Sequence, residues 1–344
     1  MVSALVPVPN DSESKLPSLD SQLAKLVIGQ PEAMASIAPF VVVSQAGLSP
    51  EDGPLGVALL LGPSGSGKTR TVEALAEILH GNRRNLLKVD CGEYQTDHEI
   101  AKLMGAPPGY LGHRETQPVL SQARINAVSS ENSPISLVLF DEIEKSSPAM
   151  QKALLGILDK AILRLGDNSI VNFERCLIFL TSNLGSKKIQ RASKGDFGFD
   201  VLLPASGPLA YNHDKIQKIG VSAVKRAFST EFVNRIDAIV TYKPLDRAAC
   251  RLILDQIFSD FSRLVRVRLG LRAFKVACTP AAQERLLDIG VTPEFGSREL
   301  KRTVQRNFIH PLAVMVTNGL VAPGDVMTLD VTAGGTFLIA NAAR

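Results

Sequence analysis

Cysteine is scarce in this sequence: the 344 residues include four cysteines, and there is no tryptophan. Cys91, Cys176, Cys250 and Cys278 lie far apart and form neither a C-x-x-C pair nor a cysteine–histidine pattern. This spacing argues against a disulfide framework and against a zinc site. Free, buried thiols are the expected alternative, and they suit a reducing compartment.

Long apolar runs and strong charge are also absent. No apolar stretch approaches the length of about 20 residues that spans a membrane, and the N-terminus lacks the basic region and apolar core of a signal peptide. We therefore expect a cytoplasmic protein without membrane contact. The net charge of +4 is small and no basic stripe is present, so the composition does not indicate nucleic acid binding.

The composition that remains is that of a soluble globular protein of two domains. Charged residues make up 21% and hydrophobic residues 45% of the chain, and the length suits one large and one small domain. Residues 1–22 include a Pro- and Ser-rich stretch without periodicity, so we expect a flexible leader or the remnant of an upstream domain. We expect a large domain over residues 23–245 and a small one over 246–344, with the boundary at Pro244 and Asp246.

The most informative stretch is residues 62–69, which fits the phosphate-binding pattern G-x-x-x-x-G-K-[ST]. An apolar run at 56–61 reads as a buried strand and residues 70–79 read as an amphipathic helix, which is the context that this loop requires. Backbone N–H groups would face phosphate oxygens, Lys68 would add a charge, and Thr69 could ligate magnesium. An ordinary turn before a helix is the plainer alternative. The predicted phosphate-binding residues are Gly62, Pro63, Ser64, Gly65, Ser66, Gly67, Lys68 and Thr69.

Polar side chains follow two further buried strands. Residues 135–140 form an apolar run that ends in Asp141 and Glu142, where a nucleotide site needs a magnesium-organising acid and a general base. An acidic helix N-terminus is the alternative. A strand over 176–181 is followed by Asn183, which could hydrogen-bond the γ-phosphate or the attacking water, or could cap the next helix.

Two loops carry aromatic residues. Residues 106–112 are rich in Pro and Gly and present Tyr110 at the tip, either as a functional surface residue or packed inward as part of a turn. Residues 185–211 read as a long surface loop, and the tripeptide 197–199 (Phe-Gly-Phe) lies within it. Beyond Asp246, a long helix, three strands and further helices predict a small mixed α/β unit.

Taken in order, the P-loop, the acid pair, Asn183, the Asn-Arg pair ending at Arg235 and the Gly-Ser-Arg run ending at Arg298 resemble an AAA+ ATPase. The chain is most similar to the second ATPase module of the Clp unfoldases and disaggregases, over nearly everything from about residue 23 to 330. Specific strings include V-I-G-Q from Val27, G-A-P-P-G-Y-L-G around Tyr110 and L-F-D-E-I-E-K around Asp141. The resemblance implies a parallel P-loop sheet flanked by helices, followed by a small lid domain.

Carried over residue by residue, the resemblance implies the following roles. Val27 and Ile28 would line the adenine pocket, while Thr69 and Asp141 would hold Mg²⁺ beside the ATP phosphates. Glu142 would activate water, Asn183 would be the first sensor and Arg298 the second. Arg235 would be an arginine finger that completes the site of a neighbouring subunit, unless it is a plain salt-bridge residue. The family assembles as a hexamer, so a homo-oligomeric ring is implied.

The resemblance also implies what ATP hydrolysis does. Tyr110 and Leu111 would face a central pore and grip unfolded or aggregated protein, since an aromatic side chain contacts many sequences without reading one. The chain departs from the family after Gly112 and again at residues 160–166, so the second pore loop is expected to work differently. No first ATPase module is recognisable. The tripeptide 197–199 is a weak indication of docking on a peptidase ring.

Two alternatives come from other classes of protein. An AAA+ module that acts on DNA is disfavoured by the missing basic stripe, and a salt-sensitive DNA-binding titration would distinguish it. A nucleotide-switched assembly scaffold is disfavoured because Glu142, Asn183 and Arg235 are all present. The leading hypothesis is an ATP-driven protein remodeller.

Overall fold

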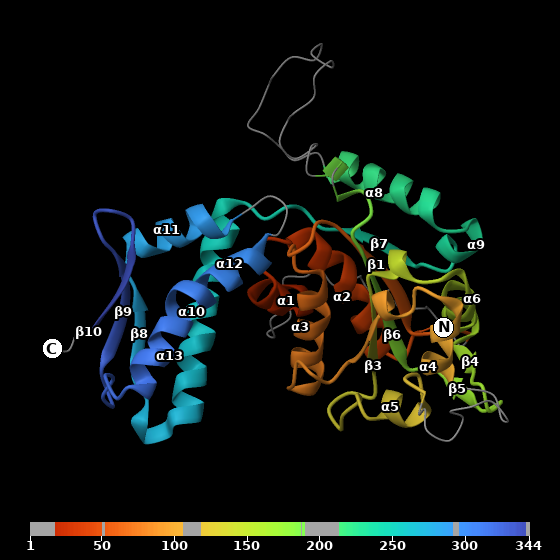
Figure 1. Cartoon of the computed structure of the whole chain (residues 1–344). Helices are drawn as coiled ribbons and strands as arrows, with labels where there is room; N and C mark the ends of the chain where they lie inside the picture. Colours follow the sequence, from red (N-terminus) through yellow and green to blue (C-terminus); the bar gives the residue numbers. More distant parts are fainter. Residues whose placement is uncertain are drawn as a thin grey trace, which may run out of the picture.

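The computed structural model of the chain describes residues 18–49, 52–105, 118–186, 188–189, 213–291 and 296–341. Figure 1 shows two units beside one another: a larger one that ends with strand β7 and a smaller one that begins with helix α10.

Five parallel strands form the central sheet of the larger unit. They are β1 (Gly56–Leu61), β2 (Leu87–Asp90), β3 (Ser136–Asp141), β6 (Cys176–Ser182) and β7 (Ala238–Thr241). Every residue of β1 and β6 is buried, which explains why both read as unbroken apolar runs. The order across the sheet is β2-β3-β6-β1-β7, so β3, β6 and β1 are direct neighbours. Their carboxyl ends, and the polar residues that follow them, therefore meet at one edge.

Helices cover both faces of this sheet (Figure 1). Ala58 and Leu60 of β1 face the apolar cluster that includes α1 (Leu19–Leu26), α2 (Pro31–Gln45) and α3 (Lys68–His80). The alternate residues of β1 face the cluster that includes α6 (Pro148–Lys160), α8 (His213–Ala227) and α9 (Thr230–Val233). The larger unit is thus a three-layer α/β fold, as the sequence predicts.

Shorter elements join these layers. They are the helices α4 (Ile100–Met104) and α5 (Gln122–Asn126), the 3₁₀ turns η1 (Cys91–Glu93), η2 (Asp97–Glu99) and η3 (Ile143–Lys145), and the hairpin of β4 (Ile162–Arg164) and β5 (Ile170–Asn172).

The smaller unit is mixed α/β, also as predicted. Its helices are α10 (Arg247–Leu269), α11 (Pro280–Gly290), α12 (Ser297–Val304) and α13 (His310–Thr317), with the 3₁₀ turn η4 (Gly270–Arg272) after α10 and the π-helical turn η5 (Gln305–Ile309) between α12 and α13. Strands β8 (Lys275–Cys278), β9 (Val326–Val331) and β10 (Phe337–Asn341) form a sheet in which β9 is central. A separate apolar core lies between helices and sheet, so this unit has its own packing.

The first helix begins earlier than the sequence suggests. The leader was expected to extend to residue 22, yet α1 starts at Leu19. The reason is apolar packing, because Leu19 contacts the cluster in which Leu23 is fully buried. Residues 19–22 therefore belong to the larger unit and not to a flexible segment.

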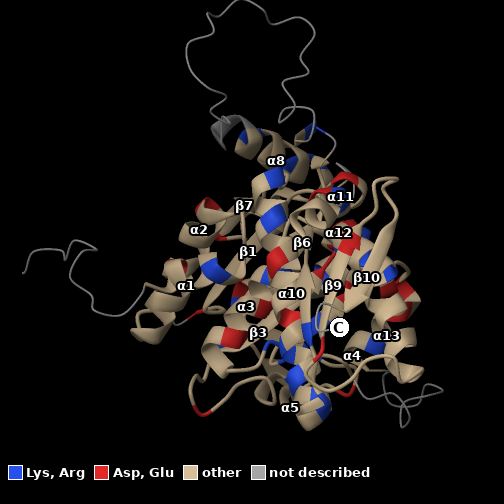
Figure 2. Cartoon of the chain, turned by 90° about the vertical axis from the view of Figure 1, so that its left-hand side faces the viewer, with Lys and Arg blue, Asp and Glu red and all other residues tan. Residues whose placement is uncertain are grey.

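Charged residues are spread over the molecule. Figure 2, which views the chain from the side of the smaller unit, shows Lys and Arg interspersed with Asp and Glu. None of the helices in the described ranges combines the length and the apolarity that crossing a bilayer requires.

Candidate active site

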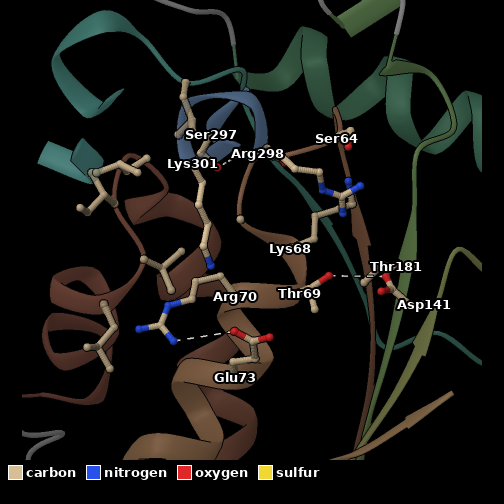
Figure 3. A pocket seen from close by; sticks show the side chains of 18 of the residues that line it. Ser64, Lys68, Thr69, Arg70, Glu73, Asp141, Thr181, Ser297, Arg298 and Lys301 are labelled. Atoms are coloured by element: carbon tan, nitrogen blue, oxygen red, sulfur yellow. Dashed lines mark hydrogen bonds and ion pairs between the residues drawn. The ribbon is translucent and has the colours of Figure 1, made fainter. Parts of the chain in front are cut away.

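A cavity of about 440 Å³ lies where the P-loop, the ends of β3 and β6, and the smaller unit come together. Figure 3 shows Lys68, Thr69 and Asp141 at this cavity, with Ser297, Arg298 and Lys301 of α12 reaching it from the smaller unit. Most of the residues predicted from the sequence line it: Val27, Ile28, Ser64, Gly65, Ser66, Gly67, Lys68, Thr69, Asp141, Glu142, Asn183 and Arg298. Gly62 and Pro63 are not among the described residues that line it, but their carbonyls accept hydrogen bonds from Lys68.

The P-loop joins β1 to α3 through a backbone that favours glycine. Gly67 is the N-cap of α3 and has φ of 106°, in the left-handed region where a side chain is strained. The helix therefore starts at Lys68 with its first N–H groups at the cavity, which is the geometry that binds phosphate.

Lys68 is held by the loop's own oxygens. Its Nζ donates to the carbonyls of Gly62 at 2.7 Å and Pro63 at 2.9 Å, and to Oδ1 of Asn183 at 2.8 Å. Burial lowers the pKa of Lys68 to about 8, although Glu144 and Asp141 act in the opposite direction. The amine is thus a positioned cation whose charge titrates near pH 8.

Asp141 gathers oxygen atoms at the end of β3. Its Oδ1 lies 3.5 Å from the Thr69 hydroxyl and also accepts a hydrogen bond from the Thr181 hydroxyl, while Lys88 Nζ lies 2.7 Å from Oδ2. Burial alone would raise the pKa of Asp141, but the bonds from Lys88 and Thr181 hold it below its ordinary value. A carboxylate beside a hydroxyl is a donor set of the kind that Mg²⁺ prefers, so these residues fit that ion.

Glu142 occupies a left-handed position after β3. Its φ is 58° and its backbone N–H donates to Thr181 Oγ1 at 3.0 Å, which fixes the turn. Its carboxylate is 31% exposed and forms an ion pair with Lys145, with 2.5 Å between Nζ and Oε2. The side chain therefore lies at the cavity wall but is already engaged.

Asn183 directly follows β6. Its backbone N–H donates to Glu144 Oε1 at 2.9 Å, and its side-chain Oδ1 accepts from Lys68. The amide thus faces the cavity, and the helix-cap alternative does not describe its side chain.

The smaller unit contacts the P-loop directly. Ser297 Oγ and its backbone N–H both donate to the Gly65 carbonyl, at 2.7 and 3.3 Å. Gly296 approaches so closely that a Cβ there would lie 3.1 Å from the Ser64 and Gly65 carbonyl oxygens. This contact carries Arg298 into the cavity, where its charge contributes to the lowered pKa of Lys68 after burial, the main cause.

An apolar wall closes the other end of the cavity. Val27 is buried, and its Cγ1 lies 3.5 Å from the point that a Cβ would occupy on Gly67. Gln30 anchors the following turn by donating a hydrogen bond to the Ser66 carbonyl at 3.2 Å. Further apolar residues come from both units: Leu26, Ile28, Leu245, Ile253 and Ile257. A flat apolar group such as a nucleobase suits this wall.

Arg235 lies elsewhere. It lines a separate groove of about 460 Å³ with Phe40 and Val43, and its Nη1 is 2.8 Å from Asp159 Oδ1. The salt bridge that the sequence leaves open is therefore present. With 44% of its side chain exposed, Arg235 is nevertheless accessible from outside.

Three predicted features lie outside the described residues: Tyr110 and Leu111 of the predicted pore loop, and the tripeptide 197–199.

Sequence reasoning missed several residues at the cavity, among them Lys88, Thr181, Ser297 and Lys301. Thr181 and Ser297 sit beside predicted residues in sequence and could have been found from that position. Lys88 lies in the middle of β2, where an exposed lysine carries no pattern of its own. Only the pairing of β2 with β3 brings it to Asp141.

Comparison with known proteins gives two family matches that divide the chain as the fold does. The profile of the AAA domain (Cdc48 subfamily) matches residues 53–239, and that of the C-terminal D2-small domain of ClpB matches residues 245–329.

Individual relatives agree with these matches. The chain is 30% identical over 329 residues to Heat shock protein 104 of Schizosaccharomyces pombe, covering 96% of this chain and 34% of that protein. It is 35% identical over 317 residues to the chaperone protein ClpB of Pseudomonas putida, covering 92% and 34%. A cryo-EM reconstruction of the closed state of Hsp104 with ATPγS and FITC-casein superposes with a TM-score of 0.74 at 25% identity, covering 93% of this chain and 51% of that one. The chain spans about a third of the length of the curated relatives it matches.

Proposed function

This chain belongs to the AAA domain family of ATPases, with a lid of the ClpB D2-small type, and we propose from that premise that it is an ATP-driven protein remodeller. The observation that carries the proposal is one cavity at which Lys68, Asp141, Asn183 and Arg298 converge from both units. In the proposed activity, a homo-oligomeric ring, as a hexamer, hydrolyses ATP and threads polypeptide through its pore.

We propose that ATP binds with its base against Val27 and Ile28 and its phosphates along the P-loop. Lys68 would exchange its bonds to the Gly62 and Pro63 carbonyls for bonds to phosphate oxygens, while backbone N–H groups of the loop orient the chain of phosphates. Arg298 would add charge-assisted hydrogen bonds from the lid, so that nucleotide strengthens the contact that the lid already makes with the P-loop.

Thr69 and Asp141 would hold Mg²⁺, because their oxygens already lie side by side. Bound magnesium neutralises charge on the β- and γ-phosphates. Before Mg²⁺ binds, the ion pair with Lys88 would keep the Asp141 carboxylate ionised.

Hydrolysis would depend on Glu142, Asn183 and a residue from outside the subunit. We propose that Glu142 accepts the proton of the attacking water and that Asn183 orients that water or the γ-phosphate. Arg235 is too far from its own cavity to line it, yet it is exposed. We propose that it reaches the γ-phosphate in the neighbouring subunit, where a guanidinium stabilises developing charge.

The output of this cycle is proposed from Tyr110 and Leu111 and from the relatives. The ClpB relative is a chaperone by name, and the Hsp104 structure was determined with FITC-casein. We propose that unfolded or aggregated polypeptide is the substrate here as well. Docking on a peptidase ring through residues 197–199 and a cytoplasmic location remain lesser parts of the proposal.

The test is the rate of phosphate release with and without an unfolded protein such as reduced, carboxymethylated lactalbumin. We expect the unfolded protein to stimulate hydrolysis. Tyr110→Ala should abolish stimulation and unfolding of a folded reporter while basal hydrolysis persists. An ATPase that ignores unfolded protein, or a variant that loses basal hydrolysis together with stimulation, contradicts the proposed pore.

A further inference from the structure

The Glu142 carboxylate is engaged by a lysine that plays no part in nucleotide binding. Lys145 lies one turn further along η3, its backbone N–H donates to the Glu142 carbonyl at 2.9 Å, and its Nζ reaches Oε2 at 2.5 Å. Glu142 lines the cavity, whereas Lys145 is absent from the described residues that line it. The ion pair therefore ties one carboxylate oxygen of Glu142 to a side chain that does not line the cavity.

This arrangement conflicts with the work of a general base. Such a group must lie within hydrogen-bond reach of the water whose proton it takes, either directly or through one further water. The ion pair occupies Oε2 and restrains the orientation of the whole carboxylate, including Oε1. Glu142 thus has to leave Lys145, or share it, before it can act.

A second acceptor for Lys145 lies close by. Asp90 ends β2, and its Oδ1 accepts from Gly92 N at 2.9 Å in the turn η1. The aliphatic part of the Lys145 side chain lies beside that turn: its Cδ is 3.7 Å from the point that a Cβ would occupy on Gly92. The bond to Glu142 raises the pKa of Lys145 above its ordinary value, and the Asp90 charge adds to this. Lys145 thus pairs with the carboxylate of Glu142, directly after β3, and feels the charge of Asp90 at the end of the adjacent strand β2.

We propose that Lys145 is a positioning residue that holds the Glu142 carboxylate away from the attacking water, and that Asp90 is the acceptor to which Lys145 moves when Glu142 is released. The inference rests on the proposed role of Glu142 as the general base. Both members of the pair are partly exposed, so the restraint is small and shifts the equilibrium by up to about fivefold. A restraint of this size suits a contact that must open in every cycle.

The first test removes the lysine. Lys145→Gln should raise kcat for basal ATP hydrolysis by up to about fivefold with KM for ATP unchanged, since Lys145 does not contact the nucleotide cavity. Lys145→Arg, which keeps the charge and an ion pair, should stay near the rate of the unaltered chain. Lys152→Gln is the matched control, because this exposed lysine of α6 undergoes the same change of charge away from Glu142.

The second test removes the competing acceptor. Asp90→Asn keeps an oxygen for the Gly92 N–H but loses the charge that attracts Lys145. The ion pair of Lys145 with Glu142 should therefore persist, and kcat should fall. In the double variant, the Asp90 change should have no further effect, and the rate should equal that of Lys145→Gln alone. Melting temperatures and the mass of the assembly are compared for all variants, so that a folding or assembly defect is recognised.

A kcat of Lys145→Gln at or below that of the unaltered chain overturns the restraint by Lys145. Additive effects in the double variant overturn the part assigned to Asp90. Glu142→Gln separates these failures from that of the proposed function: if it hydrolyses ATP normally, Glu142 is not the base and both ideas fall. If it is inactive while Lys145→Gln changes nothing, only the further inference fails.

Discussion

Lys68 combines burial with a charge that the phosphates need. Its amine lies among the carbonyls of the P-loop, and burial brings its pKa down to about 8. Only the charged form attracts phosphate. Since the neutral form gains with rising pH, binding above the pKa requires the uptake of a proton.

We therefore predict that nucleotide affinity falls as pH rises. Between pH 7 and 9 the Kd of a fluorescent ADP analogue should increase by about tenfold, as expected for one group that titrates near 8. Lys68→Arg should flatten this profile even if it binds more weakly, because a guanidinium does not deprotonate in this range. An unchanged slope in that variant would show that another group titrates.

Two buried threonines near the ends of strands on either side of β1 differ in what their hydroxyls do. Thr181 donates to Asp141 and accepts from the Glu142 N–H, so it fixes both acids of the proposed site. Thr241 is just as buried, but its hydroxyl has no hydrogen-bond partner among the described residues.

Thr181→Val should therefore reduce kcat at least tenfold, about the effect of one lost orienting hydrogen bond of roughly 1.4 kcal/mol. Circular dichroism and nucleotide binding serve to show that the fold persists. A variant with full activity would separate Thr181 from catalysis.

Thr241→Val should instead stabilise the chain by about 1 kcal/mol, because valine has nearly the same shape and removes an unsatisfied hydroxyl. Its effect is measured as the free energy of unfolding in urea. A loss of stability would indicate a partner for that hydroxyl.

At the scale of elements, the contact of α12 with the P-loop joins the two units. Ser297 is bonded to the Gly65 carbonyl, and a Cβ on Gly296, which has φ of 50°, would crowd the Ser64 and Gly65 carbonyl oxygens at 3.1 Å. The position of Arg298 in the cavity depends on this contact.

Gly296→Ala should weaken nucleotide binding more than it destabilises either unit, because the added methyl group pushes α12 away from the loop. Gly319→Ala is the control: it has a similar φ of 70°, yet a Cβ there meets nothing within 4 Å. The control places a side chain at a positive φ without the clash. Equal losses of nucleotide affinity in both variants would contradict the role of this contact.

The elements themselves were largely predictable. Strand β1 begins and ends where the apolar run at 56–61 places it, because burial decides its bounds. The long helix expected beyond Asp246 is α10, and its end at Leu269 depends on packing, since Val265 is buried and Leu269 packs on the core of the smaller unit. Boundaries that depend on such tertiary packing leave no local signal.

Some residues of the site were likewise predictable from local sequence, and others were not. Lys68, Thr69 and Asp141 follow from motif and strand context, whereas Arg298 came from the family resemblance and not from any spacing. The ion pairs of Lys88 with Asp141 and of Lys145 with Glu142 were not predicted. They depend on how strands pair and how a turn folds, which the sequence pattern does not encode.

At the scale of the whole molecule, each chain is proposed to contribute to two active sites, its own and that of a neighbouring subunit. Lys68, Asp141 and Glu142 serve its own cavity, whereas Arg235 lies in a separate groove and is proposed to serve the neighbour. If so, a monomer has an intact P-loop but hydrolyses ATP poorly, and activity rises with assembly.

A mixing experiment tests this claim most directly. Arg235→Ala and Glu142→Gln are each expected to be nearly inactive alone, the first because it lacks the proposed finger and the second because it lacks the proposed base. Mixed in equal amounts and allowed to reassemble, they should regain ATP hydrolysis, because a Glu142→Gln subunit can supply its intact Arg235 to the intact cavity of an Arg235→Ala neighbour. Phosphate release that stays at the level of the separate variants, in mixtures shown by mass to contain both subunits, would contradict the shared site.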